Sequence, residues 1–299
     1  MTKKPGQRSK KIGRKFLIFS LICWIAVVAA LLPVVASEAG ECADWRRAVQ
    51  DPFSLPGMPW PSALGRAVIN NYSTKAGLPP VVFDHWLHRA MYTCRLCHVD
   101  IGFAMKVGAT GIRAQDNEQG FFCGACHNGK RLYGGKPIFA ACSNSPASGG
   151  GGRCFRCHLD RSRAAPEYDF ATFTGKLPKE SQIPDWKDSG MIDWEKAEEE
   201  GLIKPSDYLE GVSIKRPELK TPPDFSYKPR CGWSDIIFSH RKHAVWNGCE
   251  VCHPDIFPVK KGGVRFSMND IVKGRYCGVC HDKVAFPLLF CQKCHANGM

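Results

Sequence analysis

Residues 94–98 read CRLCH, and this pattern, Cys-x-x-Cys-His, occurs six times in the chain. The other copies are residues 123–127 (CGACH), 154–158 (CFRCH), 249–253 (CEVCH), 277–281 (CGVCH) and 291–295 (CQKCH). The pattern is typical of c-type haem attachment, in which two thiols bind the vinyl groups and the next histidine binds iron. Zinc sites, disulfides and thioredoxin-like chemistry are the alternatives, but none requires a histidine after the second cysteine every time.

The motifs therefore predict six covalently bound haem c groups. The expected thioether cysteines are Cys94, Cys97, Cys123, Cys126, Cys154, Cys157, Cys249, Cys252, Cys277, Cys280, Cys291 and Cys294. The expected proximal iron ligands are His98, His127, His158, His253, His281 and His295.

The motifs form two groups of three, and each group opens with a similar stretch. Residues 83–88 read FDHWLH and residues 238–243 read FSHRKH, and in both the first histidine lies nine residues before a motif cysteine. The first and second motifs are 29 residues apart in one group and 28 in the other. This internal repeat predicts two tandem modules.

Five segments follow from this repeat and from composition. We expect a basic head with a signal or anchor helix, an N-terminal extension, module one, a proline-rich linker and module two, at residues 1–36, 37–78, 79–160, 161–230 and 231–299. The linker holds eight prolines and neither cysteine nor histidine. Asp193 to Glu200 predicts one short acidic helix that Gly201 ends, and Trp186 and Trp194 indicate that the linker packs on a module.

Each module has only about 70–80 residues, too few to bury a large apolar core without further support. Three haems per module would supply that core. With 29 glycines and 21 prolines, the chain is expected to be mostly irregular with short α-helices, little sheet and an apoprotein that does not fold.

The N-terminus carries an export signal or a membrane anchor. Residues 1–15 hold seven basic and no acidic residues, and residues 16–36 are uncharged. The uncharged run is just long enough to span a bilayer, while residues 34–36 also resemble a cleavage site. Both readings place the rest of the chain on the far side of the membrane, in the periplasm. The length of the run and the basic head favour the anchor.

The net charge of +13 does not indicate nucleic-acid binding. Without the seven basic residues of the head, the net charge is +6. Two propionates on each haem would then make the loaded protein near neutral or acidic. Nucleic acid is therefore excluded as an expected partner.

Four histidines lie outside the motifs, namely His85, His88, His240 and His243. At spacing i, i+3 on a helix, each pair lies on one face, so one helix can give a distal ligand to each of two haems. A zinc half-site or surface histidines are the alternatives. The pair recurs in the same register before each group of motifs, which favours iron ligation.

These two modules resemble the three-haem cytochrome c7 family, a relative of cytochrome c3, over residues 81–160 and 236–296. The resemblance implies that His85 and His240 ligate the first haem of each module, and His88 and His243 the second. It also implies that Met268 ligates the haem of His295, as in tandem c7-type domains. A core methionine is the alternative there.

The first module departs from this pattern. Met268 lies nine residues before Cys277, whereas Ala114 takes that place before Cys123. Met105, Met91, a lysine or a partner group could supply the sixth ligand of the His158 haem, or the site is open.

Four cysteines lie outside the motifs. Cys23 lies in the apolar run, and two of the other three, Cys42, Cys142 and Cys231, could form a disulfide.

The expected function is electron transfer by a hexahaem c-type cytochrome, not catalysis. The resemblance implies anaerobic respiration, with a quinol-oxidising membrane complex or other cytochromes as redox partners. The alternative is a multihaem reductase that acts on a small oxyanion or hydroxylamine at an open His158 haem. A structural or sensory subunit is a third possibility, but the sequence holds no signalling domain.

Overall fold

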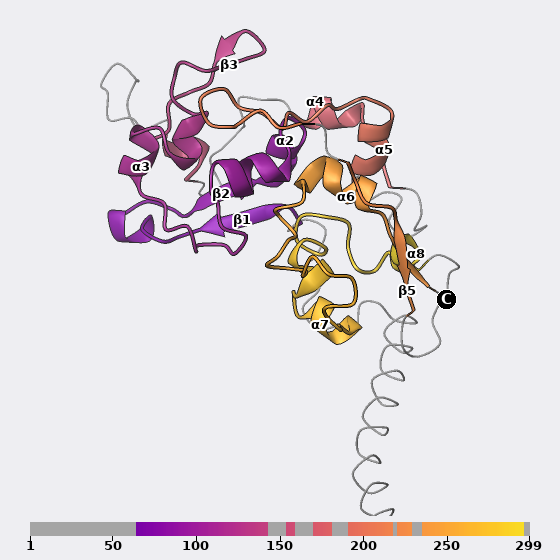
Figure 1. Ribbon diagram of the computed structural model, residues 1–299. Helices are drawn as coiled ribbons and strands as arrows, with labels where there is room; N and C mark the ends of the chain where they lie inside the picture. Colours follow the sequence, from indigo (N-terminus) through magenta and orange to yellow (C-terminus); the bar gives the residue numbers. More distant parts are fainter. Residues whose placement is uncertain are drawn as a thin grey trace, which may run out of the picture. The chain divides into compact units, whose positions relative to one another are not determined.

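The computed structural model describes residues 64–142, 154–158, 170–180, 191–217, 220–228 and 235–295. They belong to one unit, which takes in residues 57–228 and 234–299 (Figure 1). The expected signal or anchor at residues 1–36, Cys42, Trp186 and Cys231 lie outside the described residues. Within the described ranges, no helix has the length and apolarity needed to cross a membrane.

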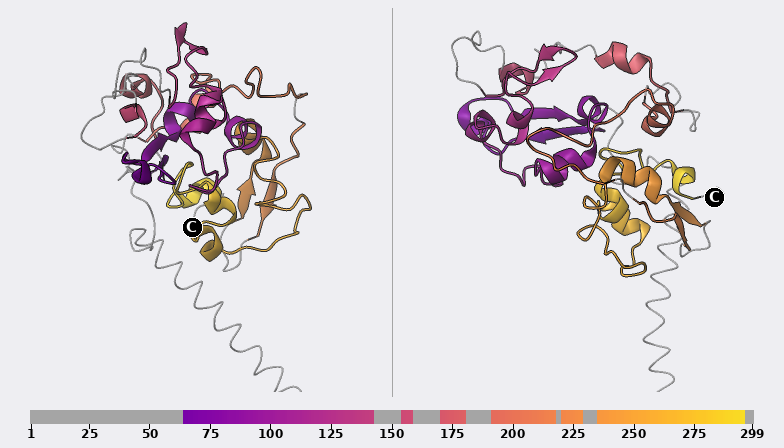
Figure 2. Two further views of the ribbon diagram at one scale, coloured as in Figure 1. Left: turned by 90° about the vertical axis from the view of Figure 1, so that its left-hand side faces the viewer. Right: turned by 45° about the horizontal axis from the view of Figure 1, so that its top comes forward.

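Each module opens with a two-stranded antiparallel sheet followed by a helix. In module one, β1 (Arg66–Ile69) pairs with β2 (Val81–Asp84), and α2 (His85–Arg89) follows directly. In module two, β5 (Phe225–Tyr227) pairs with β6 (Ile236–Phe238), and α6 (His240–Asn247) follows. Figure 2 shows both strand pairs, in indigo and in orange.

Strands β1 and β5 fall in segments that the repeat assigns to the N-terminal extension and the linker. Each has only three or four residues, so its alternation is too short to read from sequence. A two-stranded hairpin is marginal alone and needs packing against other elements. The structure thus adds one strand to each module.

The remaining elements of the modules are short helical turns and one small hairpin. Module one has η3 (Thr74–Ala76), the π-helical turn η4 (Leu96–Asp100), α3 (Ala114–Glu118), η5 (Phe122–Ala125), the hairpin of β3 (Leu132–Tyr133) and β4 (Lys136–Pro137), and η7 (Cys154–Arg156). Module two has α7 (Met268–Val272), η10 (Tyr276–Val279) and α8 (Cys291–Cys294). Short helices with little sheet are therefore present, in agreement with the sequence.

The linker contributes α4 (Phe170–Gly175) and α5 (Trp194–Glu199). Asp193 caps α5, since its side chain accepts a hydrogen bond from the Lys196 amide, and Gly201 has a φ of +69° just beyond the helix end. The predicted acidic helix is confirmed. Trp194 is buried and stacks on Trp86 at 5.6 Å between ring centroids, so this part of the linker packs on module one as expected.

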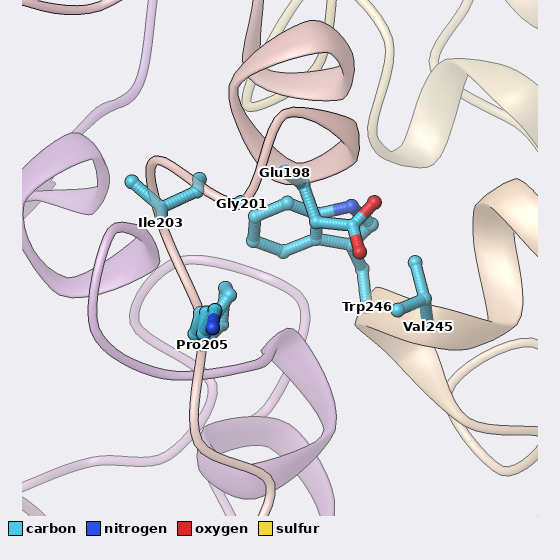
Figure 3. Close-up of a pocket in the computed structure, with 7 residues that line it drawn as sticks. Glu198, Gly201, Ile203, Pro205, Val245 and Trp246 are labelled. Atoms are coloured by element: carbon cyan, nitrogen blue, oxygen red, sulfur yellow. The ribbon is translucent and has the colours of Figure 1, made fainter.

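Helix α5 also contacts module two. Glu195 and Glu199 form ion pairs with Lys242 of α6, and Glu199 pairs with Arg241. Figure 3 shows Trp246 of α6 beside the turn after α5, where a hollow of about 290 Å³ is lined by Glu198, Gly201, Ile203, Lys204, Pro205, Val245 and Trp246. The sequence predicted that the linker packs on one module, and in the structure α5 contacts both.

Candidate cofactor-binding site

The two histidines of each opening helix lie on the same helical face in both modules. Helix α2 starts at His85 behind the Asp84 cap, and α6 starts at His240 behind the Ser239 cap. An N-cap fixes the first turn of a helix, which is where both histidine pairs lie. The predicted helical register of His85 with His88, and of His240 with His243, is therefore present.

An aromatic residue at the end of the second strand contacts both histidines of each pair. The Phe83 ring lies 4.8 Å from His85 and 4.5 Å from His88, centroid to centroid. Phe238 lies 5.0 Å from His240 and 4.4 Å from His243. The first residue of the Phe-x-His-x-x-His pattern thus holds both imidazoles, a role that the sequence alone did not assign.

Eight of the ten histidines donate a hydrogen bond from Nδ1 to a backbone carbonyl oxygen, at 2.7 to 3.2 Å. In chain order the acceptors are Gly65 for His85, Asp84 for His88, Phe103 for His98, Pro79 for His158, Pro223 for His240, Ser239 for His243, Phe257 for His253 and Phe286 for His281.

A carbonyl oxygen carries no proton, so Nδ1 must be the protonated nitrogen of each of these rings. The Nε2 lone pair of each ring is then available to a metal. Metal-binding histidines almost always have this arrangement, because the second hydrogen bond fixes the tautomer and the ring orientation. The donor set thus suits an iron cofactor bound through Nε2.

Two histidine pairs have the spacing that a shared metal requires. The ring centroids of His88 and His127 are 6.2 Å apart, and those of His243 and His281 are 6.4 Å apart. Two imidazoles on opposite sides of one metal, each bound at about 2.0–2.1 Å, have centroids about 6 Å apart, since each nitrogen lies about 1 Å from its ring centre. Each pair joins an opening helix to a second motif.

Burial keeps these rings neutral. Burial, together with the nearby His88, lowers the pKa of His127 to about 4. Burial likewise lowers the pKa of His281 to about 4, against a hydrogen bond to Phe286 that raises it. Only a neutral imidazole binds a metal, so both rings are in the required form at neutral pH. Burial also lowers the pKa of His85, with the nearby His98 acting in the same direction.

The second motif of each module closes on the short helix before it. A Cβ on Gly124 would lie 1.9 Å from the Asn117 carbonyl oxygen, and one on Gly278 would lie 1.8 Å from that of Ile271. Any side chain at either position would therefore collide with backbone. This close approach explains why both second motifs read Cys-Gly-x-Cys-His.

Met268 and Ala114 hold equivalent places. Met268 is the first residue of α7, and Ala114 is the first residue of α3. The helices have equal length and precede the two turns that carry the second motifs. The missing methionine of module one is therefore a real difference between equivalent sites. Met105 lies in the loop after His98 with 38% of its surface exposed, and its ligation of the His158 haem stays a prediction.

The third motif of each module lies against the hairpin. His158 forms a β-bridge with Val81, and His295 forms one with Ile236. His295 is buried. The ligation of its haem by Met268 stays a prediction.

Attachment cysteines of different motifs lie near one another. Burial, together with the Cys126 thiol of the second motif, raises the pKa of Cys97 to about 12. Burial also raises the pKa of Cys280 to about 12, and Cys94 and Cys252 act in the same direction. Thus, the first motif of module one lies near the first and second motifs of module two.

Cys142 carries a free thiol that accepts a hydrogen bond from Asn117.

Ionic contacts tie the first motifs of the two modules to the linker. Arg95, inside the first motif, pairs with Asp100 and with Asp207 of the linker at 2.8 Å each. Arg216 of the linker pairs with Asp100 and with Glu250, inside the fourth motif. Arg95 is only 1% exposed. These contacts join sites that lie far apart in the sequence, and no sequence pattern pointed to them.

Comparisons with known proteins agree with this site. The family model described as "Cytochrome c7 and related cytochrome c" matches residues 81–165 and 236–296. Among solved structures, a c7-type three-haem cytochrome domain is 41% identical, covering 25% of this chain and 93% of that domain, with a TM-score of 0.24. The C-terminal hexahaem fragment of a dodecahaem cytochrome c is 25% identical over 77% of this chain and 96% of the fragment, with a TM-score of 0.23. Its N-terminal hexahaem fragment is 23% identical over 79% and 99%, also with a TM-score of 0.23. No curated protein matches the chain.

Proposed function

The chain belongs to the family of cytochrome c7 and related c-type cytochromes, and on this premise we propose that it carries electrons through six haems. It is a multihaem c-type cytochrome. The observation that carries the proposal is the repeated pairing of opening-helix and motif histidines, at 6.2 Å in module one and 6.4 Å in module two. A covalently bound haem supplies reversible one-electron chemistry at its iron.

The chain's own residues hold and orient this cofactor. The twelve motif cysteines would provide the thioether bonds, and each of the six motif histidines would provide one iron-binding nitrogen. His85, His88, His240 and His243 would provide the second nitrogen at four of the haems, while Phe83 and Phe238 pack against those rings. Carbonyl groups that accept from Nδ1 keep the rings in place during electron transfer.

The proposed setting is anaerobic respiration in the periplasm. The basic head and the apolar run of residues 16–36 support export, with that run either cleaved or kept as an anchor. A quinol-oxidising membrane complex and other cytochromes are the proposed redox partners. Two modules of the same family in one chain support a role in passing electrons along a series of haems.

A reductase is the second candidate, and one observation favours it. Ala114 occupies the place that Met268 holds in module two. If no other group replaces the missing sulfur, the iron bound to His158 has an open coordination position. Such a site could bind nitrite, hydroxylamine or sulfite.

A reductive titration of the oxidised holoprotein without oxygen separates the two functions. Electron transfer predicts uptake of six electrons per chain, followed by reoxidation by a second cytochrome. It also predicts that nitrite, hydroxylamine and sulfite reoxidise the reduced protein no faster than buffer does. Saturable reoxidation by any of these three compounds would replace the proposal with a reductase. Uptake of fewer than six electrons would contradict the six-haem assignment.

A further inference from the structure

Arg89, the last residue of α2, lies inside a group of three tryptophans. Its guanidinium carbon lies 5.9 Å from the Trp86 ring centre, 5.3 Å from that of Trp194 and 4.6 Å from that of Trp246. These rings come from α2, from the linker helix α5 and from α6 of module two. Figure 3 shows Trp246 reaching from α6 toward the turn after α5. Contacts between a cation and aromatic faces stabilise a desolvated charge in such a place.

Arg89 also bonds directly to module two. Its Nη1 donates a hydrogen bond of 2.8 Å to the carbonyl oxygen of Val284, three residues after His281. A second bond lies beside it, from the Gly65 amide to the Lys283 carbonyl oxygen, at 2.6 Å. The Gly65 carbonyl in turn accepts from Nδ1 of His85. The helix with both distal histidines of module one is thereby fastened to the fifth motif.

Within the described part of the chain, no carboxylate balances the charge of Arg89. Its Nε is buried without a hydrogen-bond partner, and no carboxylate of the described residues forms an ion pair with it. A buried charge without a counter-charge is strongly unfavourable, because the charge has lost its hydration. A guanidinium cannot lose its proton under ordinary conditions to relieve that cost. An anion beside this position would offset that cost, and the described residues place no carboxylate there.

Two attachment motifs lie next to this charge. Cys94 packs against the cluster that contains Trp86, Trp194 and Trp246. Arg89 interacts electrostatically with the thiols of Cys94 and Cys280 and with the His281 ring. The first attachment motif of module one and the second attachment motif of module two therefore both lie close to Arg89.

We propose that Arg89 is a positioning residue that supplies the counter-charge for haem carboxylates at the junction of the two modules. This inference rests on the proposed function, because it requires that haems occupy the sites of His98 and His281. A fixed positive charge favours the reduced form of a nearby haem, since reduction adds one negative charge. Arg89 would thus raise the midpoint potential of the junction haems while it joins their modules.

The test compares the holoproteins of R89Q, R89K and the wild type in redox titrations that resolve single haems by their NMR methyl signals. R89Q should shift the oxidised-to-reduced ratio of a junction haem about tenfold toward oxidised at fixed potential, which is about 59 mV for one electron. R89K keeps the charge and should lie near the wild type. R113Q removes an exposed arginine that contacts the Tyr72 ring, and should leave the junction potentials unchanged.

If Arg89 only stabilises the contact between the modules, the variants would give another result. In that case R89Q and R89K would both lower the unfolding temperature while all the potentials stay at their wild-type values, which would overturn the proposal. An equal shift in R89K and R89Q would also overturn it. If the wild type itself carries no haem at these sites, the proposed function fails, and this outcome is visible before any variant is compared.

Discussion

At the scale of single residues, the glycine of each second motif shows what the sequence could and could not reveal. The repeated Cys-Gly-x-Cys-His marked Gly124 and Gly278 as shared features. The reason for glycine lies in the carbonyl oxygen of a residue seven positions earlier, 1.8 to 1.9 Å from where a Cβ would be. That contact depends on how the turn folds back on the helix, and the sequence does not encode it as a local pattern.

Gly278→Ala is expected to disturb the second motif of module two. The added Cβ must displace the Ile271 carbonyl, and such overpacking costs more than about 2 kcal/mol. The holoprotein should unfold at a lower temperature and should lose haem at Cys277 and Cys280, as intact mass would report. Gly175→Ala is the control, because its Cβ meets no atom within 4 Å. Full haem loading and unchanged stability in Gly278→Ala would contradict the geometry.

Ala114 offers a second test at the same scale. Ala114→Met places a thioether at the first residue of α3, where α7 has Met268. If this position of the His158 haem is open, we expect one further methionine-ligated haem, because the added thioether can bind that iron as a sixth ligand. The near-infrared magnetic circular dichroism of the oxidised protein measures this. Ala114→Leu adds similar bulk without sulfur, and identical spectra for both variants would refute the expected role of the position.

At the scale of elements, the helices were easier to predict than the strands. Asp193, the acidic first turn and Gly201 together predicted α5, because capping signals are local. The opening helices α2 and α6 followed from the repeated histidine spacing. Strands β1 and β5 were not predicted, because contacts distant in sequence stabilise them. Each pairs with a partner strand, and a histidine hydrogen-bonds to a carbonyl just before it: His85 to Gly65 and His240 to Pro223.

Trp194→Ala tests the role of α5 in joining the modules. The buried indole stacks on Trp86 and contacts Arg89, so its removal should cost about 3–5 kcal/mol. The unfolding temperature of the holoprotein checks this. Glu195→Gln removes only a partly exposed ion pair with Lys242 and should cost less than about 1 kcal/mol. Equal losses in the two variants would show that the aromatic stack does not hold α5 in place.

At the scale of the whole molecule, the two modules were readable from the sequence and their junction was not. Six motifs and a repeated opening stretch gave the number and kind of modules. Arg89 of module one bonds to Val284 of module two, and Arg95 of module one bonds to Asp207 of the linker, in both cases across more than 100 residues. Such pairs leave no periodic signal, and composition does not indicate them. From the histidine geometry that both modules share, we expect every motif to carry a haem with a defined axial ligand.

The most direct test of this claim joins intact mass with near-infrared magnetic circular dichroism of the oxidised holoprotein. The account predicts six haems per chain, with at least four iron centres held by two histidines and at least one held by histidine and methionine. Fewer than six haems would contradict the account. So would a full set of six without the signature of four histidine pairs, because the fixed imidazoles of α2 and α6 would then bind no iron.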